Sequence, residues 1–134
     1  MNILERIDNY FKETGMFFLA TEDGDQPKCR PLGLSAIIDG QLYFGVGGFK
    51  DVYKQLCENP KVELVASKQA DWLRVYGEAV FETDYTIADK LMEIAPFLKN
   101  IYNEETGNKL EVFHLEHATA EFRSLLAVEE SYSF

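Results

Sequence analysis

The sequence predicts a mainly β protein: a barrel of six or seven antiparallel strands with helices at its ends. Segments with alternating apolar and polar residues recur along the chain, and two of the joints between them carry the hairpin signals Asp23-Gly24 and Asp39-Gly40. Apolar residues at helical spacing mark residues 2–14 and 84–95 as amphipathic helices. Because six strands in an open sheet would leave two exposed edges, closure into a barrel is favoured.

The length of 134 residues suits one domain, so we expect residues 1–134 to form a single domain. No apolar run has the length of a membrane span, and the N-terminal segment is amphipathic and mixed in charge, unlike a signal peptide. We therefore expect a cytoplasmic protein with no membrane partner. The two cysteines, Cys29 and Cys57, fit a reducing compartment, and no Cys/His spacing resembles a metal site.

The net charge of −10 argues against nucleic acid as a partner, since phosphate backbones require a basic surface. Lys and Arg together number only 13. Five of them lie in the segments around a glycine turn at 47–48: Lys28, Arg30, Lys50, Lys54 and Arg74. An acidic protein that binds a phosphorylated ligand must gather positive charge locally, and these positions would allow it.

The chain begins with an expected helix over residues 2–14, which Gly15 ends and which would cover the core. A strand over 16–21 then leads through the first Asp-Gly turn into a second strand over 28–38. The second Asp-Gly turn returns the chain into a third strand that starts at Leu42. Two such turns and three strands predict an antiparallel meander.

The stretch from Leu42 to Leu64 combines a strand with one buried face, a Gly47-Gly48 turn, Lys50, a helix over 51–58 and a further strand. Glycines at the turn permit unusual backbone angles and close approach of a ligand. A lysine at a helix start adds a charge to free N–H groups, which favours an anion. The alternative is an ordinary turn with a solvated lysine.

The second strand contains Arg30-Pro31 followed by Gly33. Proline donates no ladder hydrogen bond and glycine weakens a strand, so this position indicates an edge, a bulge or a place where a ligand meets the backbone. An edge strand with a surface arginine is the alternative interpretation.

Strands are expected over 62–67 and 72–83. In the latter, Trp72, Arg74 and Tyr76 share the face opposite the apolar one, a set that can contact a flat ligand or a partner subunit. A cross-strand surface cluster would account for them equally well.

The rest of the chain is expected to contain the helix over 84–95 capped by Asp84, a helical turn over 97–102, a loop over 103–108, and a closing hairpin of strands 111–116 and 119–125 that turns near His117-Ala118. The tail 128–134 is expected to be loosely held. No nucleophile–histidine–carboxylate signature is present, so no catalytic side chain is assigned.

Four blocks of the sequence, in order, resemble the pyridoxamine 5′-phosphate oxidase-related, FMN-binding split-barrel family. They are FLATEDGDQPKCRPLGL, DGQLYFGVGGFKDVYKQLCENPKVEL, WLRVYGEAVFE and EVFHLEHATAEFRSL, and they span nearly the whole chain. The resemblance implies a homodimeric split barrel of six or seven antiparallel strands, with FMN in the clefts between the subunits.

The resemblance also implies roles for particular residues. The flavin would be lined by Cys29, Arg30, Pro31 and Leu32, its phosphate held by Gly47, Gly48, Phe49 and Lys50, and Trp72 and Arg74 would reach it from the same or the other subunit. Family members often carry threonine or serine in the phosphate turn, so phosphate contact here would depend more on backbone N–H groups and Lys50. The C-terminal arginine–histidine segment with which true pyridoxamine phosphate oxidases bind their substrate is missing, so we do not assign that substrate to this chain.

Two functions of different class follow from this resemblance. One is an FMN-dependent oxidoreductase with a small-molecule substrate or an electron donor such as NAD(P)H, in which the flavin performs the transfer. The other is a non-catalytic module that binds FMN or another flat cofactor, such as haem or a deazaflavin.

Overall fold

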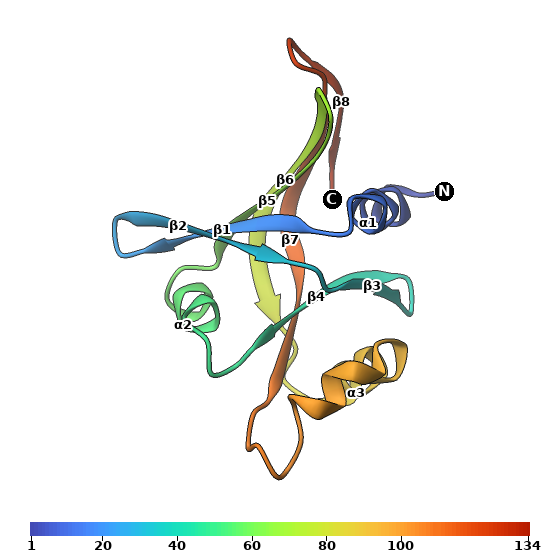
Figure 1. The fold of residues 1–134 in the computed structure, drawn as a ribbon. Helices are drawn as coiled ribbons and strands as arrows, with labels where there is room; N and C mark the ends of the chain where they lie inside the picture. Colours follow the sequence, from blue (N-terminus) through green and yellow to red (C-terminus); the bar gives the residue numbers. More distant parts are fainter.

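Eight antiparallel strands form one curled sheet, a half-barrel, in the computed structural model, which describes residues 1–134 (Figure 1). The order across the sheet is β2-β1-β5-β6-β7-β4-β3, and β8 also pairs with β7. The elements along the chain are α1 (Ile3–Thr14), β1 (Phe17–Asp23), β2 (Gln26–Leu32), β3 (Ser35–Ile38), β4 (Gln41–Gly47), α2 (Asp51–Glu58), β5 (Lys61–Lys68), β6 (Asp71–Phe81), α3 (Thr86–Ile94), the 3-10 helix η1 (Pro96–Asn100), β7 (Leu110–Arg123) and β8 (Val128–Ser133).

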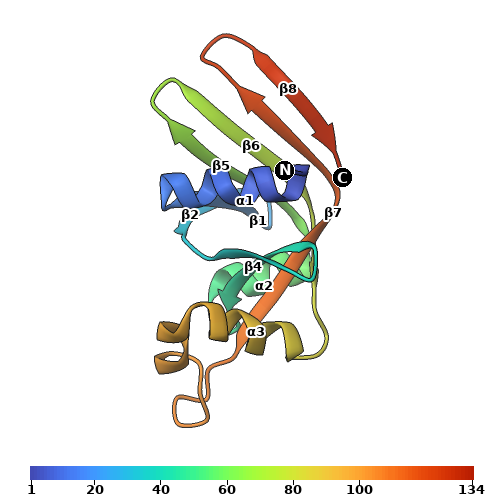
Figure 2. The same ribbon diagram turned by 90° about the vertical axis from the view of Figure 1, so that its right-hand side faces the viewer.

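The helices cover two faces of the sheet. The larger core lies between one face and the helices α1 and α2, with Phe11 and Leu56 fully buried in it. A smaller core lies under α3 on the other face of β3, β4 and β7, around Leu91 and Val112 (Figure 2). The strand β4 is therefore buried on both faces, with Phe44 in one core and Tyr43 in the other, whereas the sequence predicted one buried face.

The predicted helices and most predicted strands are confirmed at nearly the expected positions. Asn2 caps α1, its side chain accepting the Glu5 N–H at 2.9 Å, and Gly15 ends the helix with φ of 76°. The helix α2 covers 51–58 as predicted, and α3 begins two residues after Asp84, whose carboxylate accepts the Thr86 N–H at 2.9 Å. None of the helices combines the length and the apolar composition that a membrane span requires.

The predicted meander is wrong. The expected second strand is divided at residues 33–34 into β2, which pairs with β1 at one end of the strand order, and β3, which pairs with β4 at the other. The two Asp-Gly turns thus close two separate hairpins. Pro31 lies in β2, which is an edge strand as one interpretation held, but Arg30 is not the surface arginine of the alternative, since its side chain is part-buried.

The predicted closing hairpin is also wrong, because residues 110–123 form one continuous strand. At His117-Ala118 the strand carries a bulge: two residues of β7 face Gly77 of β6, and His117 has φ of 50°. The interruption of the alternating apolar pattern at His117-Ala118 therefore comes from this bulge and not from a turn. The turn lies at 124–127, where the Ser124 N–H donates to Ala127 O at 2.9 Å.

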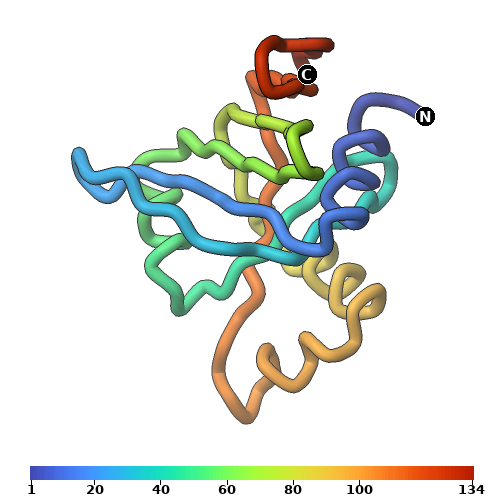
Figure 3. The backbone as a smooth tube through the Cα atoms, turned by 45° about the horizontal axis from the view of Figure 1, so that its top comes forward, coloured from blue at the N-terminus to red at the C-terminus, as the bar shows by residue number.

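The C-terminal tail is paired, contrary to the prediction that it is loosely held. β8 follows β7, and Phe134 and Ala118 exchange two backbone hydrogen bonds of 2.8 and 2.7 Å. Arg6 of α1 forms an ion pair with Glu130 of β8 at 2.9 Å, so the two chain ends lie near one another (Figure 3).

We expect Gly77→Ala to lower the free energy of unfolding by about 1–3 kcal/mol. A Cβ at Gly77 would lie 2.8 Å from Ala118 Cβ and 2.9 Å from its Cα, so the backbone of the bulge would have to shift. Urea unfolding measures the effect. The control is Gly33→Ala, whose Cβ would meet only Gly15 O at 3.6 Å. Equal midpoints for the two variants would contradict the prediction.

Candidate functional site

A cavity of about 260 Å³ lies where β2, the end of β4, the start of α2 and η1 meet. Most of its wall is apolar, and Arg30, Lys50 and Tyr102 are its polar side chains. The lining residues are Leu19, Arg30, Pro31, Leu32, Gly33, Leu34, Gly45, Val46, Gly47, Lys50, Val52, Phe97, Leu98 and Tyr102. Apolar walls with a few convergent polar groups are typical of a small-molecule site.

An open groove of about 900 Å³ adjoins this cavity and shares Arg30, Pro31, Lys50 and Val52 with it. Four cationic side chains line the groove, Lys28, Arg30, Lys50 and Lys54, against three carboxylates, Asp23, Asp51 and Glu58. In a protein of net charge −10, this is the local gathering of positive charge that the sequence suggested. Arg74, the fifth residue of that set, does not line the groove.

Arg30 is held by two side chains that sequence reasoning did not assign to the site. Its Nη1 donates to Thr21 Oγ1 at 2.8 Å, and its Nη2 donates to Gln55 Oε1 at 2.8 Å. Thr21 in turn donates to Gln55 Oε1 at 2.6 Å, and both side chains are buried. Burial lowers the pKa of Arg30, which stays cationic at neutral pH. Gln55 could have been found from the sequence by its position on the apolar face of α2, because a buried polar side chain there needs a hydrogen-bond partner.

Lys50 is the N-cap residue of α2, and its exposed side chain is free of ion pairs, since the ion-paired lysines are Lys12, Lys28, Lys68 and Lys90. No side chain caps this helix, which leaves N–H groups of its first turn available to a ligand. Together with the positive end of the helix dipole, they form a place suited to an anion.

The turn before Lys50 differs in detail from the expectation. Neither Gly47 nor Gly48 adopts a positive φ. The space at 47 is occupied by side chains, because a Cβ there would lie 2.8 Å from Cε1 of the half-exposed Phe49, which would have to move. The N–H groups of Gly48 and Lys50 donate to Lys109 O and Gly47 O, so the free donors belong to the first turn of α2 instead.

Of the remaining predicted site residues, some line the cavity or the groove and others line neither. Pro31 and Leu32 line the cavity and half-exposed Phe49 lines the groove, whereas exposed Cys29 lines neither. Trp72 and Arg74 do not reach the cavity of their own chain.

Trp72 and Arg74 lie on the outer face of β6 in a cluster with β5 and β7. The guanidinium carbons of Arg74 and Arg123 each lie 4.8 Å from the Trp72 ring centroid. Arg74 forms ion pairs with Glu63 at 3.3 Å and Glu121 at 3.6 Å. The sequence correctly placed Trp72 and Arg74 on one face. It could not show that Glu63, Glu121 and Arg123 join them in this cluster, because that depends on which strands pair.

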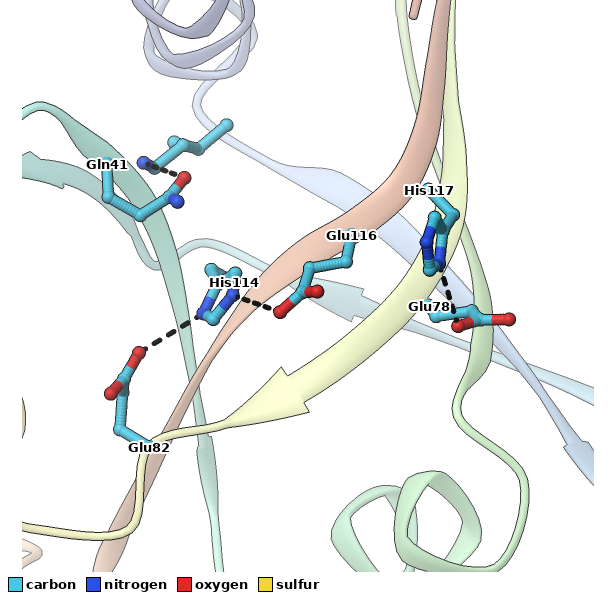
Figure 4. Close-up of polar contacts among 7 residues, drawn as sticks. Gln41, Glu78, Glu82, His114, Glu116 and His117 are labelled. Carbon is cyan, nitrogen blue, oxygen red and sulfur yellow. Dashed lines mark hydrogen bonds and ion pairs between the residues drawn. The ribbon is translucent and has the colours of Figure 1, made fainter. Parts of the chain in front are cut away.

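His114 and His117 lie on β7 and do not line the cavity. Figure 4 shows the carboxylates beside them. His114 lies between two carboxylates, with Nδ1 3.1 Å from Glu82 Oε1 and Nε2 2.9 Å from Glu116 Oε2. His117 at the bulge has one polar contact, from Nδ1 to Glu78 Oε2 at 3.3 Å. A hollow of about 570 Å³ beside His117 has the carboxylates Glu22, Glu63 and Glu78 in its wall, which makes it less suited to an anionic ligand than the cavity at Arg30.

No protein-family model matches the sequence, and no curated protein matches it. Solved structures, in contrast, do match this chain. A NimC/NimA family protein from Clostridium acetobutylicum is 31% identical, with a TM-score of 0.87, and the match covers 98% of this chain and 92% of that one.

Two further structures share the fold at lower identity. A pyridoxinephosphate oxidase family protein from Clostridium acetobutylicum, related to general stress protein 26, is 12% identical with a TM-score of 0.68 and coverage of 98% and 92%. An FAD-binding protein from Mesorhizobium loti is 18% identical with a TM-score of 0.56 and coverage of 92% and 96%.

The fold is therefore that of the pyridoxamine 5′-phosphate oxidase-like split barrels, as the resemblance predicted. Among these proteins, the chain belongs to the NimC/NimA family.

Proposed function

We propose that residues 1–134 act as one FMN-binding domain of an oxidoreductase, with the flavin in the cavity and its phosphate in the groove. The observation that carries this proposal is the position of Arg30 and Lys50 where an apolar cavity opens into a cationic groove. The shared fold with a protein described as FAD-binding supports a flavin as the ligand.

The residues fit a flavin mononucleotide in four respects. The apolar cavity wall suits a flat ring system, and the cationic groove suits a phosphate. Gly47 lacks the Cβ that would push apart the two aromatic side chains beside it, Phe49 and Tyr102. The uncapped first turn of α2 supplies N–H donors for an anion beside Lys50.

A bound flavin would itself supply hydride or electron transfer, which accounts for a site without an acid–base pair. The chain would bind and orient it. Arg30, fixed by Thr21 and Gln55, presents a positive charge in a part-buried position where charges interact more strongly than in water. Leu19, Leu32 and Val46, which line the cavity, would exclude water from the ring.

We further propose a cytoplasmic homodimer that uses NAD(P)H as electron donor and joins through the outer face of β1, β5 and β6. On this face Phe18 is about half exposed and Tyr76 is 38% exposed, and Met16, which directly precedes β1, is also about half exposed. An exposed aromatic and aliphatic patch of this kind is typical of an interface. Assembly there would allow Trp72 and Arg74, which do not reach the cavity of their own chain, to contact the flavin of the partner.

The absorbance spectrum of the purified protein, with mass analysis of the ligand released on denaturation, tests the cofactor. We expect the visible bands of a flavin and the mass of FMN, and bleaching of those bands when NADPH is added without oxygen. A haem spectrum, or failure of the apo protein to bind added FMN, would refute the proposal. FMN binding without reduction by NADPH or NADH would instead indicate the non-catalytic module.

A further inference from the structure

Tyr102 presents a hydroxyl group to the cavity that has no hydrogen-bond partner in the chain. The hydroxyl groups of Tyr85 and Tyr132 donate to Glu111 and Glu130, at 2.9 and 2.7 Å. The Tyr102 side chain is half-buried in the cavity wall, and the burial of its ring is what raises its pKa. A free hydroxyl group in a mostly apolar wall is suited to a ligand acceptor.

The backbone on both sides of Tyr102 is held by several hydrogen bonds. The Tyr102 N–H donates to Leu98 O at 2.9 Å, and Thr106 Oγ1 donates to Ile101 O at 2.7 Å. The Asn103 side chain donates to Lys99 O at 2.8 Å. The polar loop 103–108 therefore fixes the position from which the phenol extends, so little conformational entropy is lost when it binds a ligand.

The other side of the phenol lies against the end of β4. A Cβ at Gly47 would lie 3.1 Å from the Tyr102 hydroxyl oxygen, so glycine at this position makes room for the hydroxyl. The Phe49 and Tyr102 ring centroids lie 6.4 Å apart. Tyr102 thus lies between η1 and the strand that leads to Lys50.

We propose that Tyr102 is a further cofactor-binding residue, whose hydroxyl donates a hydrogen bond to the ring system or ribityl chain of the flavin. This inference rests on the proposed function. The ring and ribityl chain are chosen over the phosphate because Tyr102 lines the apolar cavity and not the cationic groove. The Tyr102 O–H is protonated at neutral pH, as a phenol ordinarily is, and burial moves its pKa further upward, so the group is able to donate.

Titration of the apo protein with FMN and with riboflavin tests the proposal through Tyr102→Phe. We expect both ligands to bind about three- to tenfold more weakly, the effect of one neutral hydrogen bond. The melting temperature of the apo variant should stay unchanged, because the hydroxyl has no partner in the chain to lose. The control is Tyr85→Phe, which removes a hydroxyl bound to Glu111 outside the cavity and should bind both ligands like the wild type.

The possible failures can be told apart. If the wild type binds neither flavin, the proposed function fails and the role of Tyr102 fails with it. If the wild type binds FMN and Tyr102→Phe binds both ligands equally well, only the role of Tyr102 is refuted. A loss confined to FMN would refute the assignment to the ring or ribityl chain, because it would place the hydroxyl on the phosphate.

Discussion

Replacing Lys50 by alanine is expected to weaken FMN binding by about tenfold to a hundredfold and to leave riboflavin binding unchanged. A hydrogen bond to a charged partner contributes about 1.5–3 kcal/mol, and riboflavin lacks the phosphate that would form it. Lys50 is available for this contact, because its side chain is exposed, free of ion pairs and located at the uncapped start of α2.

Lys54 offers a matched control for this prediction. It lines the same groove but is the fourth residue of α2, about one turn from the uncapped start, so Lys54→Ala should change FMN binding much less. Titrations at two salt concentrations add a second readout, since the wild type should lose more FMN affinity with salt than Lys50→Ala does.

Two results would contradict the role of Lys50. An equal loss for FMN and riboflavin would mean that Lys50 shapes the turn without contacting the phosphate. No loss for either ligand would mean that the side chain is only solvated.

The sequence identified the elements of the fold better than their pairing. Alternation and turn signals located β1, β4, β5 and β6, and helical spacing located all three α-helices. The division of 28–38 into β2 and β3 was missed because local signals cannot tell which strand pairs with which. The continuity of β7 was missed for a related reason: a bulge and a hairpin turn both require a break in the alternation, here at His117-Ala118.

For the candidate site, residues close together in sequence were the predictable part. Gly47 and Lys50 line the cavity, and their place at a turn between a strand and a helix suggested this, whereas the position of Arg30 in the same wall was implied by the family resemblance. Thr21 and Tyr102 could not be found in the same way, because they approach these residues only through the pairing of β1 with β2 and the packing of the segment after η1 against the end of β4.

The structure also separates Trp72 from the core, which the sequence could only suggest. Trp72 belongs to neither buried cluster, and its ring packs against the guanidinium groups of Arg74 and Arg123 on the outer face. This aromatic surface is flanked by ion pairs between Arg74 and Glu63 and between Arg123 and Glu121. Large aromatic and arginine side chains of this kind contribute most of the binding energy at protein interfaces.

We therefore expect Trp72→Ala to raise the dissociation constant of the proposed homodimer by about thirtyfold or more, the effect of losing about 2 kcal/mol at an interface hot spot. FMN affinity should fall together with dimer stability, because the partner's Trp72 would no longer complete the site. Sedimentation velocity over a range of protein concentrations measures the first effect, and FMN titration at each concentration measures the second.

The matched control for this variant is Tyr132→Ala on β8. Tyr132 also contacts a guanidinium, with Arg6 5.4 Å from its ring centroid, but it lies beside α1 and away from the proposed interface. Its removal should leave the dimer and FMN binding unchanged. A wild-type protein that sediments as a monomer with flavin bound would exclude the dimer. If Trp72→Ala instead destabilised the apo protein by about 3 kcal/mol or more with FMN affinity unchanged, Trp72 would be stabilising the fold of its own chain.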